Sequence, residues 1–177
     1  MQKNSDISGA VLSDDLVELA GRLGQRLSEA GHMLALAESC TGGWIAQSVT
    51  EIAGSSVWFD RGFVTYSNSA KTAMLGVRES TLQQYGAVSP QTASEMAAGA
   101  LAHSAADIAL AVTGIAGPGG GTAEKPVGLV FIAWQRRGQP CRCRELHFEG
   151  DRHAIRRQTV VKALRGLLDE YRETDRP

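Results

Sequence analysis

The sequence predicts an α/β fold, a three-layer α/β/α sandwich with a mixed, mostly parallel sheet. Short apolar runs typical of buried strands alternate along the chain with segments of helical periodicity. Near the C-terminus two apolar runs are joined by a short turn, which adds one antiparallel strand. No repeat or linker-like segment interrupts the pattern, so we expect one domain over residues 13–172 after a flexible lead-in at 1–12.

The first half of the chain alternates as this fold requires. Leucines at helical spacing precede Gly31, and an apolar run follows them. Further on, a β-branched and aromatic run predicts a second strand. The expected elements are a helix from 13 to 31, a strand at 33–37, a helix ending at Gly54 and a strand at 57–66.

The second half continues the alternation and closes with a hairpin. Ser89 and Pro90 form a typical helix start, with serine as the cap and proline in the first turn. The turn expected at 136–140 contains glycine and proline. The expected elements are helices at 69–75, 78–85, 90–105 and 150–171, and strands at 108–112, 127–134 and 142–148.

The composition limits the classes of function. Of 177 residues, 43% are hydrophobic, which is enough for a core that needs neither disulfides nor metal. A formal net charge of −1 argues against a general nucleic-acid binder, because neutralising phosphates requires a basic surface. Three cysteines do not form a disulfide framework, and no apolar run approaches the roughly 18 residues of a membrane span. We expect a cytoplasmic protein without membrane or nucleic-acid partners.

Two segments with unusual composition follow predicted strands. They are Glu38–Gly43 and the glycine-rich Thr113–Gly121. In sheets of this kind, ligands bind beyond the carboxyl ends of the strands. We therefore expect both segments to face one crevice.

Ser39 is the candidate nucleophile. It stands between a strand end and a helix start, where first-turn amides near Thr41, Gly42 and Gly43 have no intrahelical acceptor and can hold an oxyanion. The two glycines would also let a substrate approach the backbone. The ordinary alternative is that Ser39 simply caps a helix. Cys40 is a rival nucleophile, although packing beneath the helix is its more common role.

A serine nucleophile needs a base. The chain has no Gly-x-Ser-x-Gly motif and no histidine at a predicted strand end near Ser39, so a Ser-His-Asp triad is not indicated; His147 and His153 stay open as alternatives. Lys71 follows the second strand. As a base it must be neutral, which requires burial to lower its pKa from ~10.4 to about 7–8. The alternative is a solvated lysine on a helix surface.

The glycine-rich segment is a candidate nucleotide-binding loop. Successive free amides can hold a phosphate or ribose, but the segment leads into a strand and matches neither nucleotide-binding glycine motif. A flexible connection is the alternative. Arg152, at the start of the last helix, suits an anion, whereas Arg156 and Arg157 are expected on the solvated face.

No metal site is expected. Cys141 and Cys143 point to one face of a strand, but no matching ligands accompany them. Paired carboxylates with the spacing of a magnesium site are also missing from the sequence, which argues against a phosphohydrolase that uses the glycine-rich loop.

Seven segments taken together resemble the CinA C-terminal domain family, over about residues 14–170. They are Ala37-Glu-Ser-Cys-Thr-Gly-Gly43, Ala53-Gly-Ser-Ser56, Gly62-Phe-Val-Thr-Tyr-Ser-Asn68, Gly86-Ala-Val-Ser89, Thr113-Gly-Ile-Ala-Gly-Pro-Gly-Gly120, Lys125-Pro-Val-Gly128 and Phe148-Glu-Gly-Asp-Arg152. The closest likeness is to the stand-alone nicotinamide-nucleotide amidohydrolases of the family. The resemblance implies a three-layer sandwich, and hydrolysis of nicotinamide mononucleotide to nicotinate mononucleotide and ammonia without metal or organic cofactor.

The resemblance also implies roles for individual residues. The family's nucleophile falls on Ser39 and its lysine base on Lys71. Tyr66 and Thr113 match supporting polar positions of the catalytic site. The positions implied to line the nucleotide site are Gly114, Gly117, Gly119 and Arg152. Longer relatives carry an amino-terminal pyrophosphatase domain, and we expect no such activity here.

One further class of function stays open, a catalytically silent module that senses nucleotides or binds a partner. For the enzyme, the expected partner is a small molecule, a pyridine mononucleotide. If the chain forms a homo-oligomer, a dimer is the expected form.

Overall fold

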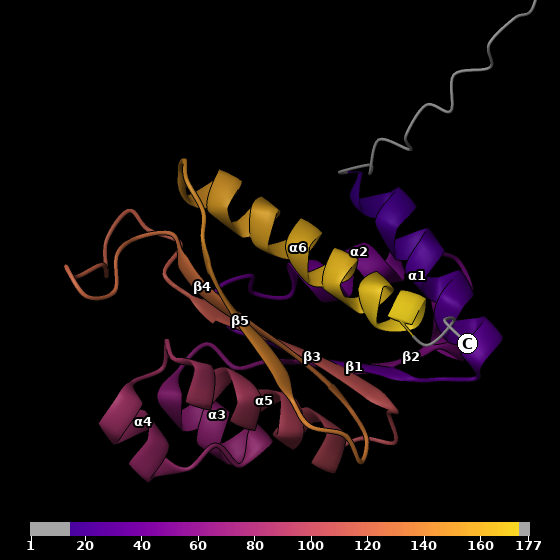
Figure 1. The fold of residues 1–177 in the computed structure, drawn as a ribbon, viewed down its shortest axis with the longest axis horizontal. Helices are drawn as coiled ribbons and strands as arrows, with labels where there is room; N and C mark the ends of the chain where they lie inside the picture. Colours follow the sequence, from indigo (N-terminus) through magenta and orange to yellow (C-terminus); the bar gives the residue numbers. More distant parts are fainter. Residues whose placement is uncertain (1–14, 174–177) are drawn as a thin grey trace, which may run out of the picture.

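The computed structural model describes residues 15–173, which build one five-stranded sheet with helices on both faces (Figure 1). The strands are β1 (Leu34–Glu38), β2 (Phe59–Val64), β3 (Ile108–Gly114), β4 (Leu129–Arg136) and β5 (Arg142–His147). The helices are α1 (Leu16–Ala30), α2 (Trp44–Thr50), α3 (Asn68–Leu75), α4 (Glu79–Tyr85), α5 (Pro90–Ala102) and α6 (Arg152–Glu173), and a 3-10 turn, η1 (Ser55–Val57), precedes β2. The lead-in expected at 1–12 lies outside the described residues.

The strand directions confirm the predicted mixed sheet. The strand order is β2-β1-β3-β4-β5, and β1 pairs in parallel with both β2 and β3. Strand β4 is antiparallel to β3 and to β5, so it is the single reversed strand. The hairpin between β4 and β5 turns at Gly138, whose φ of 75° lies in the left-handed region.

Some element boundaries differ from the sequence prediction. Val57, expected in a strand, lies in the 3-10 turn and is 71% exposed. The left-handed Gly54 starts this turn by accepting a hydrogen bond from the Val57 amide, so the strand begins only at Phe59. Local β propensity is overridden here by a turn that the glycine permits.

The two faces of the sheet bury side chains of different size. Helices α1, α2 and α6 cover one face, and α3, α4 and α5 cover the other (Figure 1). On the first face large apolar side chains of the strands meet leucines of α1 and α6. The strand residues in this cluster are Leu34, Leu36, Ile108, Leu110, Val112, Val130, Ile132 and Trp134.

The opposite face buries small side chains over β1 and β3, whereas β4 contributes the larger Leu129 and Phe131. Alanines of β1 and β3 lie on this face and pack against Ala93, Ala97 and Ala100 of α5. Because these side chains are small, the helix and the sheet approach closely. Gly99 of α5 extends the close approach to α3, because a Cβ there would lie 2.0 Å from the carbonyl oxygen of Leu75. The position of α3 against the sheet therefore depends on small residues in α5.

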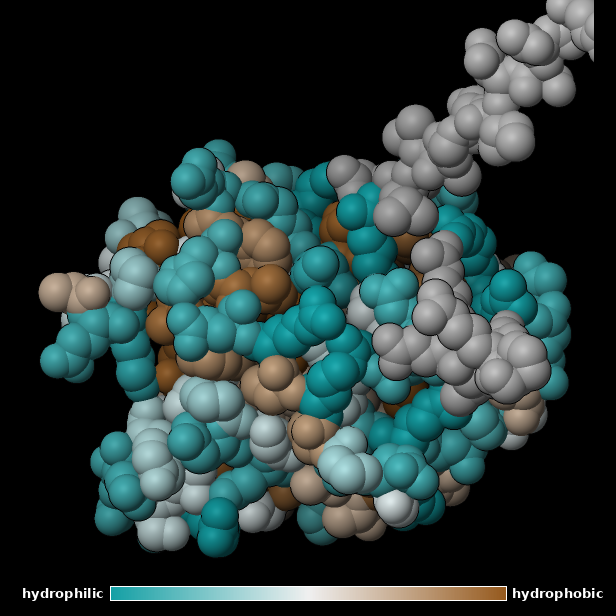
Figure 2. Space-filling view, in the orientation of Figure 1, coloured by the Kyte–Doolittle hydropathy of each residue, from teal (hydrophilic) through white to brown (hydrophobic). Residues whose placement is uncertain are grey.

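The outer surface over α6 and β5 is mainly hydrophilic. Figure 2 shows an apolar area between these two elements. Leu146 and Phe148 are partly buried and pack against the core cluster that contains residues of α6. Within residues 15–173, no helix is long and apolar enough to cross a membrane.

A pair of glycine substitutions tests the close approach of α5 and α3. We expect Gly99→Ala to lower the stability by about 1–3 kcal/mol, because the added methyl meets backbone. That loss lowers Tm by roughly 2–4 °C per kcal/mol. Gly21→Ala in α1 is the matched control, since its nearest neighbour would be Ile52 Cδ1 at 3.8 Å. Thermal unfolding of both variants is the measurement, and equal Tm values would contradict this packing.

Candidate active site

The segments that follow β1, β2 and β3 meet at one edge of the sheet. Ser39, directly after β1, donates its backbone N–H to the carbonyl of Val112 in β3 at 3.1 Å. On the other side, the N–H of Thr65, directly after β2, donates to the carbonyl of Glu38 at 2.8 Å. The serine-bearing turn is thus held between its two neighbouring strands.

Ser39 and Lys71 form a hydrogen-bonded pair at this edge. The amine Nζ of Lys71 donates to Ser39 Oγ at 3.0 Å and to the carbonyl of Thr65 at 2.7 Å. Lys71 is only 1% exposed and Ser39 is 9% exposed. Helix α3 carries the lysine to this position. The helix is capped by Ser67, whose side chain accepts a hydrogen bond from the Ala70 amide. The solvated-surface alternative for Lys71 is therefore wrong.

Burial lowers the pKa of Lys71 from its ordinary value of 10.5, because removing water penalises the charged amine. The nearby Cys40 acts in the opposite direction and is the smaller effect. The two hydrogen-bond acceptors of Nζ, the Ser39 hydroxyl and the Thr65 carbonyl, are uncharged groups. The environment thus favours a neutral amine beside the serine oxygen.

Cys40 has the properties of a packing residue rather than of a nucleophile. It is buried in the core cluster beneath α2. Burial raises the pKa of its thiol to about 12, so the reactive thiolate is disfavoured at neutral pH.

The first-turn donors of α2 are largely occupied, in contrast to the expectation from the sequence. The buried carboxylate of Glu38, 1% exposed, accepts from the N–H of Gly43 at 3.1 Å, of Ile45 at 3.1 Å and of Ala46 at 2.8 Å. The Gly42 N–H donates to the Ser39 carbonyl at 3.0 Å. The amides of Gly42 and Gly43 are therefore not free to hold an oxyanion.

Both glycines of this turn have left-handed backbone conformations, with φ of 61° at Gly42 and 95° at Gly43. Their backbone geometry accounts for glycine at these positions without any substrate contact. Arg156 lies against the same turn, donating from Nε to the Cys40 carbonyl at 3.1 Å and from Nη2 to the Thr41 carbonyl at 2.8 Å. The expectation of a solvated Arg156 is wrong.

Neither alternative histidine is bonded to Ser39 or Lys71 in the described part of the chain. His147 is exposed and pairs with Glu145 at 2.9 Å. The ring of His153 lies 5.0 Å from that of Trp44, at the start of α2. The structure places Lys71, and not a histidine, beside the serine.

Arg152 connects three segments around the edge. It donates from Nη1 to the Gly117 carbonyl at 2.8 Å and from Nη2 to the Tyr66 hydroxyl at 2.9 Å. This contact joins the glycine-rich loop to the segment between β2 and α3. The hydroxyl of Thr113 instead donates to the Ala87 carbonyl at 2.7 Å, and so holds the loop before α5.

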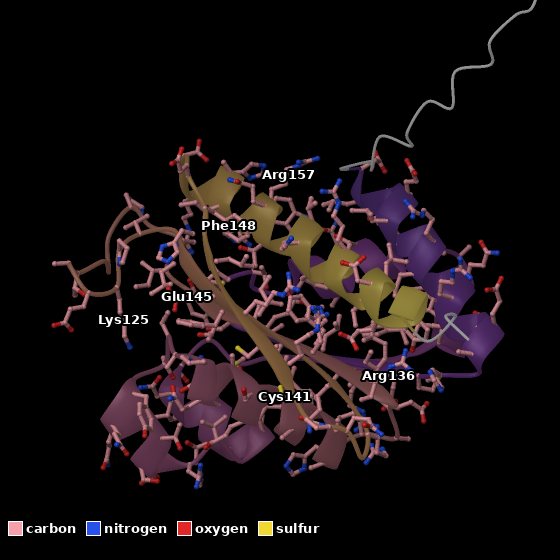
Figure 3. The ribbon with its side chains drawn as sticks, in the orientation of Figure 1. Lys125, Arg136, Cys141, Glu145, Phe148 and Arg157 are labelled. Atoms are coloured by element: carbon pink, nitrogen blue, oxygen red, sulfur yellow. The ribbon has the colours of Figure 1, made fainter. Side chains whose placement is uncertain are left out.

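Much of the glycine-rich loop is packed against its own fold. A Cβ at Gly114 would lie 2.6 Å from Val130, and one at Gly117 would lie 2.6 Å from Val127. Only Gly119 among the three candidate glycines has nothing within 4 Å of an added Cβ. The loop is also anchored through Lys125, whose Nζ donates to the carbonyls of Tyr85 and Val88 (Figure 3).

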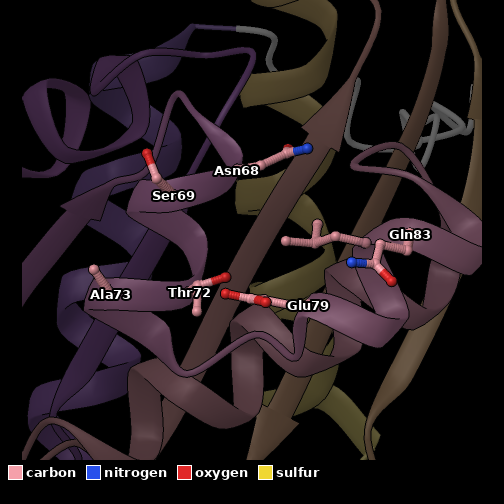
Figure 4. Close-up of a pocket in the computed structure, with 7 residues that line it drawn as sticks. Asn68, Ser69, Thr72, Ala73, Glu79 and Gln83 are labelled. Carbon is pink, nitrogen blue, oxygen red and sulfur yellow. The ribbon is translucent and has the colours of Figure 1, made fainter.

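A surface pocket of about 560 Å³ lies between α3 and α4 (Figure 4). Its walls include Asn68, Thr72 and Gln83, but neither Ser39 nor Lys71. The pocket therefore borders a different face of α3 from the one that carries the buried lysine.

The structure reveals two site residues that the sequence analysis did not identify, Glu38 and Arg156. A signal was present for Glu38, because an acidic residue just before a helix complements its positive end. No local signal points to Arg156, whose partners lie more than a hundred residues earlier in the chain.

The chain is similar in sequence to several proteins that carry the same name. The chain is 52% identical over 158 residues to the nicotinamide-nucleotide amidohydrolase PncC of Escherichia coli (strain K12), covering 89% of this chain and 95% of the relative. It is 50% identical over 155 residues to PncC of Pseudomonas putida, covering 88% and 96%.

A crystal structure and a family pattern complete the comparison. The structure of the competence/damage inducible protein CihA from Agrobacterium tumefaciens superposes with a TM-score of 0.86 at 52% identity, covering 91% of this chain and 98% of that chain. The CinA C-terminal domain pattern matches residues 16–171. With that match spanning the whole sheet and its helices, the chain belongs to the CinA C-terminal domain family.

Proposed function

We propose that this chain hydrolyses the carboxamide of nicotinamide mononucleotide, giving nicotinate mononucleotide and ammonia. The observation that carries the mechanism is the buried contact between Lys71 Nζ and Ser39 Oγ at 3.0 Å. The substrate class is supported by the relatives named nicotinamide-nucleotide amidohydrolase, which align over almost their full length.

In the first step, the neutral amine of Lys71 accepts the Ser39 proton while the serine oxygen attacks the carboxamide carbon. A tetrahedral intermediate forms with negative charge on the former carbonyl oxygen. Because the amides of Gly42, Gly43, Ile45 and Ala46 have acceptors already, we assign the oxyanion to the Thr41 and Cys40 amides at the start of the turn.

In the second step, the protonated Lys71 gives its proton to the leaving nitrogen, and ammonia departs from the acyl-enzyme. Water, deprotonated by the same lysine, then attacks the ester carbon and releases nicotinate mononucleotide with Ser39 restored. The proposed chemistry uses no metal or organic cofactor.

The remaining site residues are assigned to substrate binding and support. We assign nucleotide contacts to Arg152 and Tyr66, which are hydrogen-bonded to each other, and to the exposed Gly119. For Gly114 and Gly117 we propose a role in shaping the loop, since both face side chains. Thr113 acts by tethering the loop before α5.

Ser39→Ala tests the nucleophile. We expect ammonia release from nicotinamide mononucleotide to be abolished, because only the attacking oxygen is removed, while folding and product binding persist. Ammonia assays and calorimetric titration with nicotinate mononucleotide are the measurements. More than a few per cent of residual activity would remove Ser39 from this role, and absence of activity in the wild-type protein would reject the proposed substrate.

Lys71→Arg tests the base. Arginine keeps a positive charge but stays protonated, so it cannot accept the serine proton. We expect kcat to fall by ~10² or more. In the wild-type protein, lowering of the lysine pKa by burial predicts that kcat rises with pH through an apparent pKa below 10.5.

Steady-state kinetics of both proteins across pH values decide between a base and a binding role. A lysine that only positions the substrate predicts a near-normal kcat and an altered KM in Lys71→Arg. That result would end the Ser39–Lys71 proposal and return attention to His147 and His153.

Metal removal tests the proposed independence from cofactors. Within residues 15–173, no group of three or more His, Cys, Asp or Glu side chains is arranged to hold a metal ion. We expect activity to survive exhaustive dialysis against EDTA. Loss of activity on chelation, with recovery on adding one specific divalent ion, would contradict the mechanism.

A further inference from the structure

We propose that Glu38 and Arg156 are positioning residues, which together fix the Ser39 turn so that Ser39 Oγ faces Lys71 Nζ. The inference rests on the proposed function, because it deepens the role of the same site. The sequence analysis assigned neither residue a role in the site. In the structure, the side chain of each residue contacts backbone groups of the turn.

Glu38 holds the turn by accepting hydrogen bonds from donors of the turn. Besides the three backbone amides already described, the Thr41 hydroxyl donates to Glu38 Oε2 at 2.6 Å. Four donors therefore converge on one carboxylate that is almost completely buried. A buried carboxylate is costly without such partners, so the geometry of the turn and the charge of Glu38 depend on each other.

Arg156 holds the same turn by donating hydrogen bonds to carbonyl groups of the turn. Its guanidinium reaches the carbonyls of Cys40 and Thr41, and lies over the ring of Trp44 at 5.3 Å. The planar, forked guanidinium can bridge two carbonyls at once, which an ammonium group cannot reproduce. The segment from Cys40 to Ala46 is thus held at N–H groups by the Glu38 carboxylate and at carbonyl groups by the Arg156 guanidinium.

The link to catalysis is the direct peptide bond between Glu38 and Ser39. The Ser39 hydroxyl has to stay within hydrogen-bond distance of a lysine carried by a different helix. Misplacement of a reacting group by about 1 Å can cost ~10² in rate. A residue that sets this distance should therefore affect kcat more than substrate affinity.

Glu38→Gln is the informative variant. It keeps the shape of the side chain but replaces one acceptor oxygen by a donor. Oε1 and Oε2 both receive a backbone N–H in the native structure, so at least one N–H must then face an NH2 group. We expect kcat to fall by roughly 10- to 100-fold with KM changed by less than about threefold.

The control is Glu51→Gln, at the other end of α2. Glu51 is exposed and accepts from Gln47 at 3.3 Å, so its substitution removes a carboxylate of the same helix without touching the turn. We expect wild-type kinetics. If Glu38→Gln does not fold, Thr41→Val and Thr41→Ser replace it. Valine loses the donor to Glu38 and serine keeps it, so we expect a lower kcat in Thr41→Val than in Thr41→Ser.

Arg156→Lys separates positioning from substrate binding. Lysine keeps the charge and loses the two-pronged contact with the turn. Positioning predicts a lower kcat at nearly constant KM. A guanidinium that binds the substrate phosphate instead predicts a higher KM and an unchanged kcat, and this outcome would remove Arg156 from the proposal.

Covalent labelling gives a readout that does not depend on the natural substrate. A neutral alkyl fluorophosphonate forms a bond from phosphorus to Ser39 Oγ and expels fluoride, while the serine proton passes to Lys71. We would measure the second-order labelling rate by intact-protein mass spectrometry on folded wild-type, Glu38→Gln, Arg156→Lys and Glu51→Gln proteins. We expect rates at least about tenfold lower in Glu38→Gln than in the wild type and the Glu51 control.

The outcomes distinguish the positioning role of Glu38 from the proposed substrate. Equal labelling and kcat in Glu38→Gln, with only Tm lowered, would show a purely structural cap and overturn the inference. Labelling of Ser39 without ammonia release from nicotinamide mononucleotide would reject the proposed substrate, while the labelling ratio would still decide the role of Glu38. No labelling of the wild-type protein would remove Ser39 as nucleophile and the positioning inference with it.

Discussion

The contact between a buried lysine amine and a serine oxygen is the constraint on which the site depends. Lys71 reaches Ser39 only because α3 lies close to the end of β1, with Nζ also bonded to the Thr65 carbonyl. Desolvation lowers the pKa of the amine, and neither hydrogen-bond acceptor of the amine carries a negative charge that would stabilise its protonated form. A position that is unfavourable for a charged lysine is favourable for a base.

The same edge of the sheet holds a second buried ionisable group, with the opposite requirement. The Glu38 carboxylate accepts hydrogen bonds from four donors of the turn, whereas the Lys71 amine donates to two uncharged acceptors. The positive end of α2 is thereby used to hold the turn in place rather than to bind the substrate. This division of roles moves the expected oxyanion donors from the helix turn to the amides before it.

The fold could be predicted from the sequence, and Ser39 and Lys71 could be identified as candidates whose pairing the family resemblance implied, but the surroundings of this pair could not be predicted. Apolar runs separated by helical periodicity specify the layers, and Ser39 and Lys71 follow strands whose ends meet at one edge. Val57 shows the limit of local propensity, because a turn starting at Gly54 decides its conformation. The partners of Arg156 and Thr113 depend on contacts between distant segments, for which no periodic pattern exists.

Whether Lys71 can act as the base depends on its protonation state in the resting protein. With lysines labelled by 13C at Cε, the Lys71 resonance, assigned by its loss in Lys71→Arg, can be followed by NMR as pH is varied. Burial of the amine predicts a Lys71 titration midpoint below the ordinary 10.5. A midpoint at or above 10.5 would mean that the amine stays charged at neutral pH, and would contradict its role as the base.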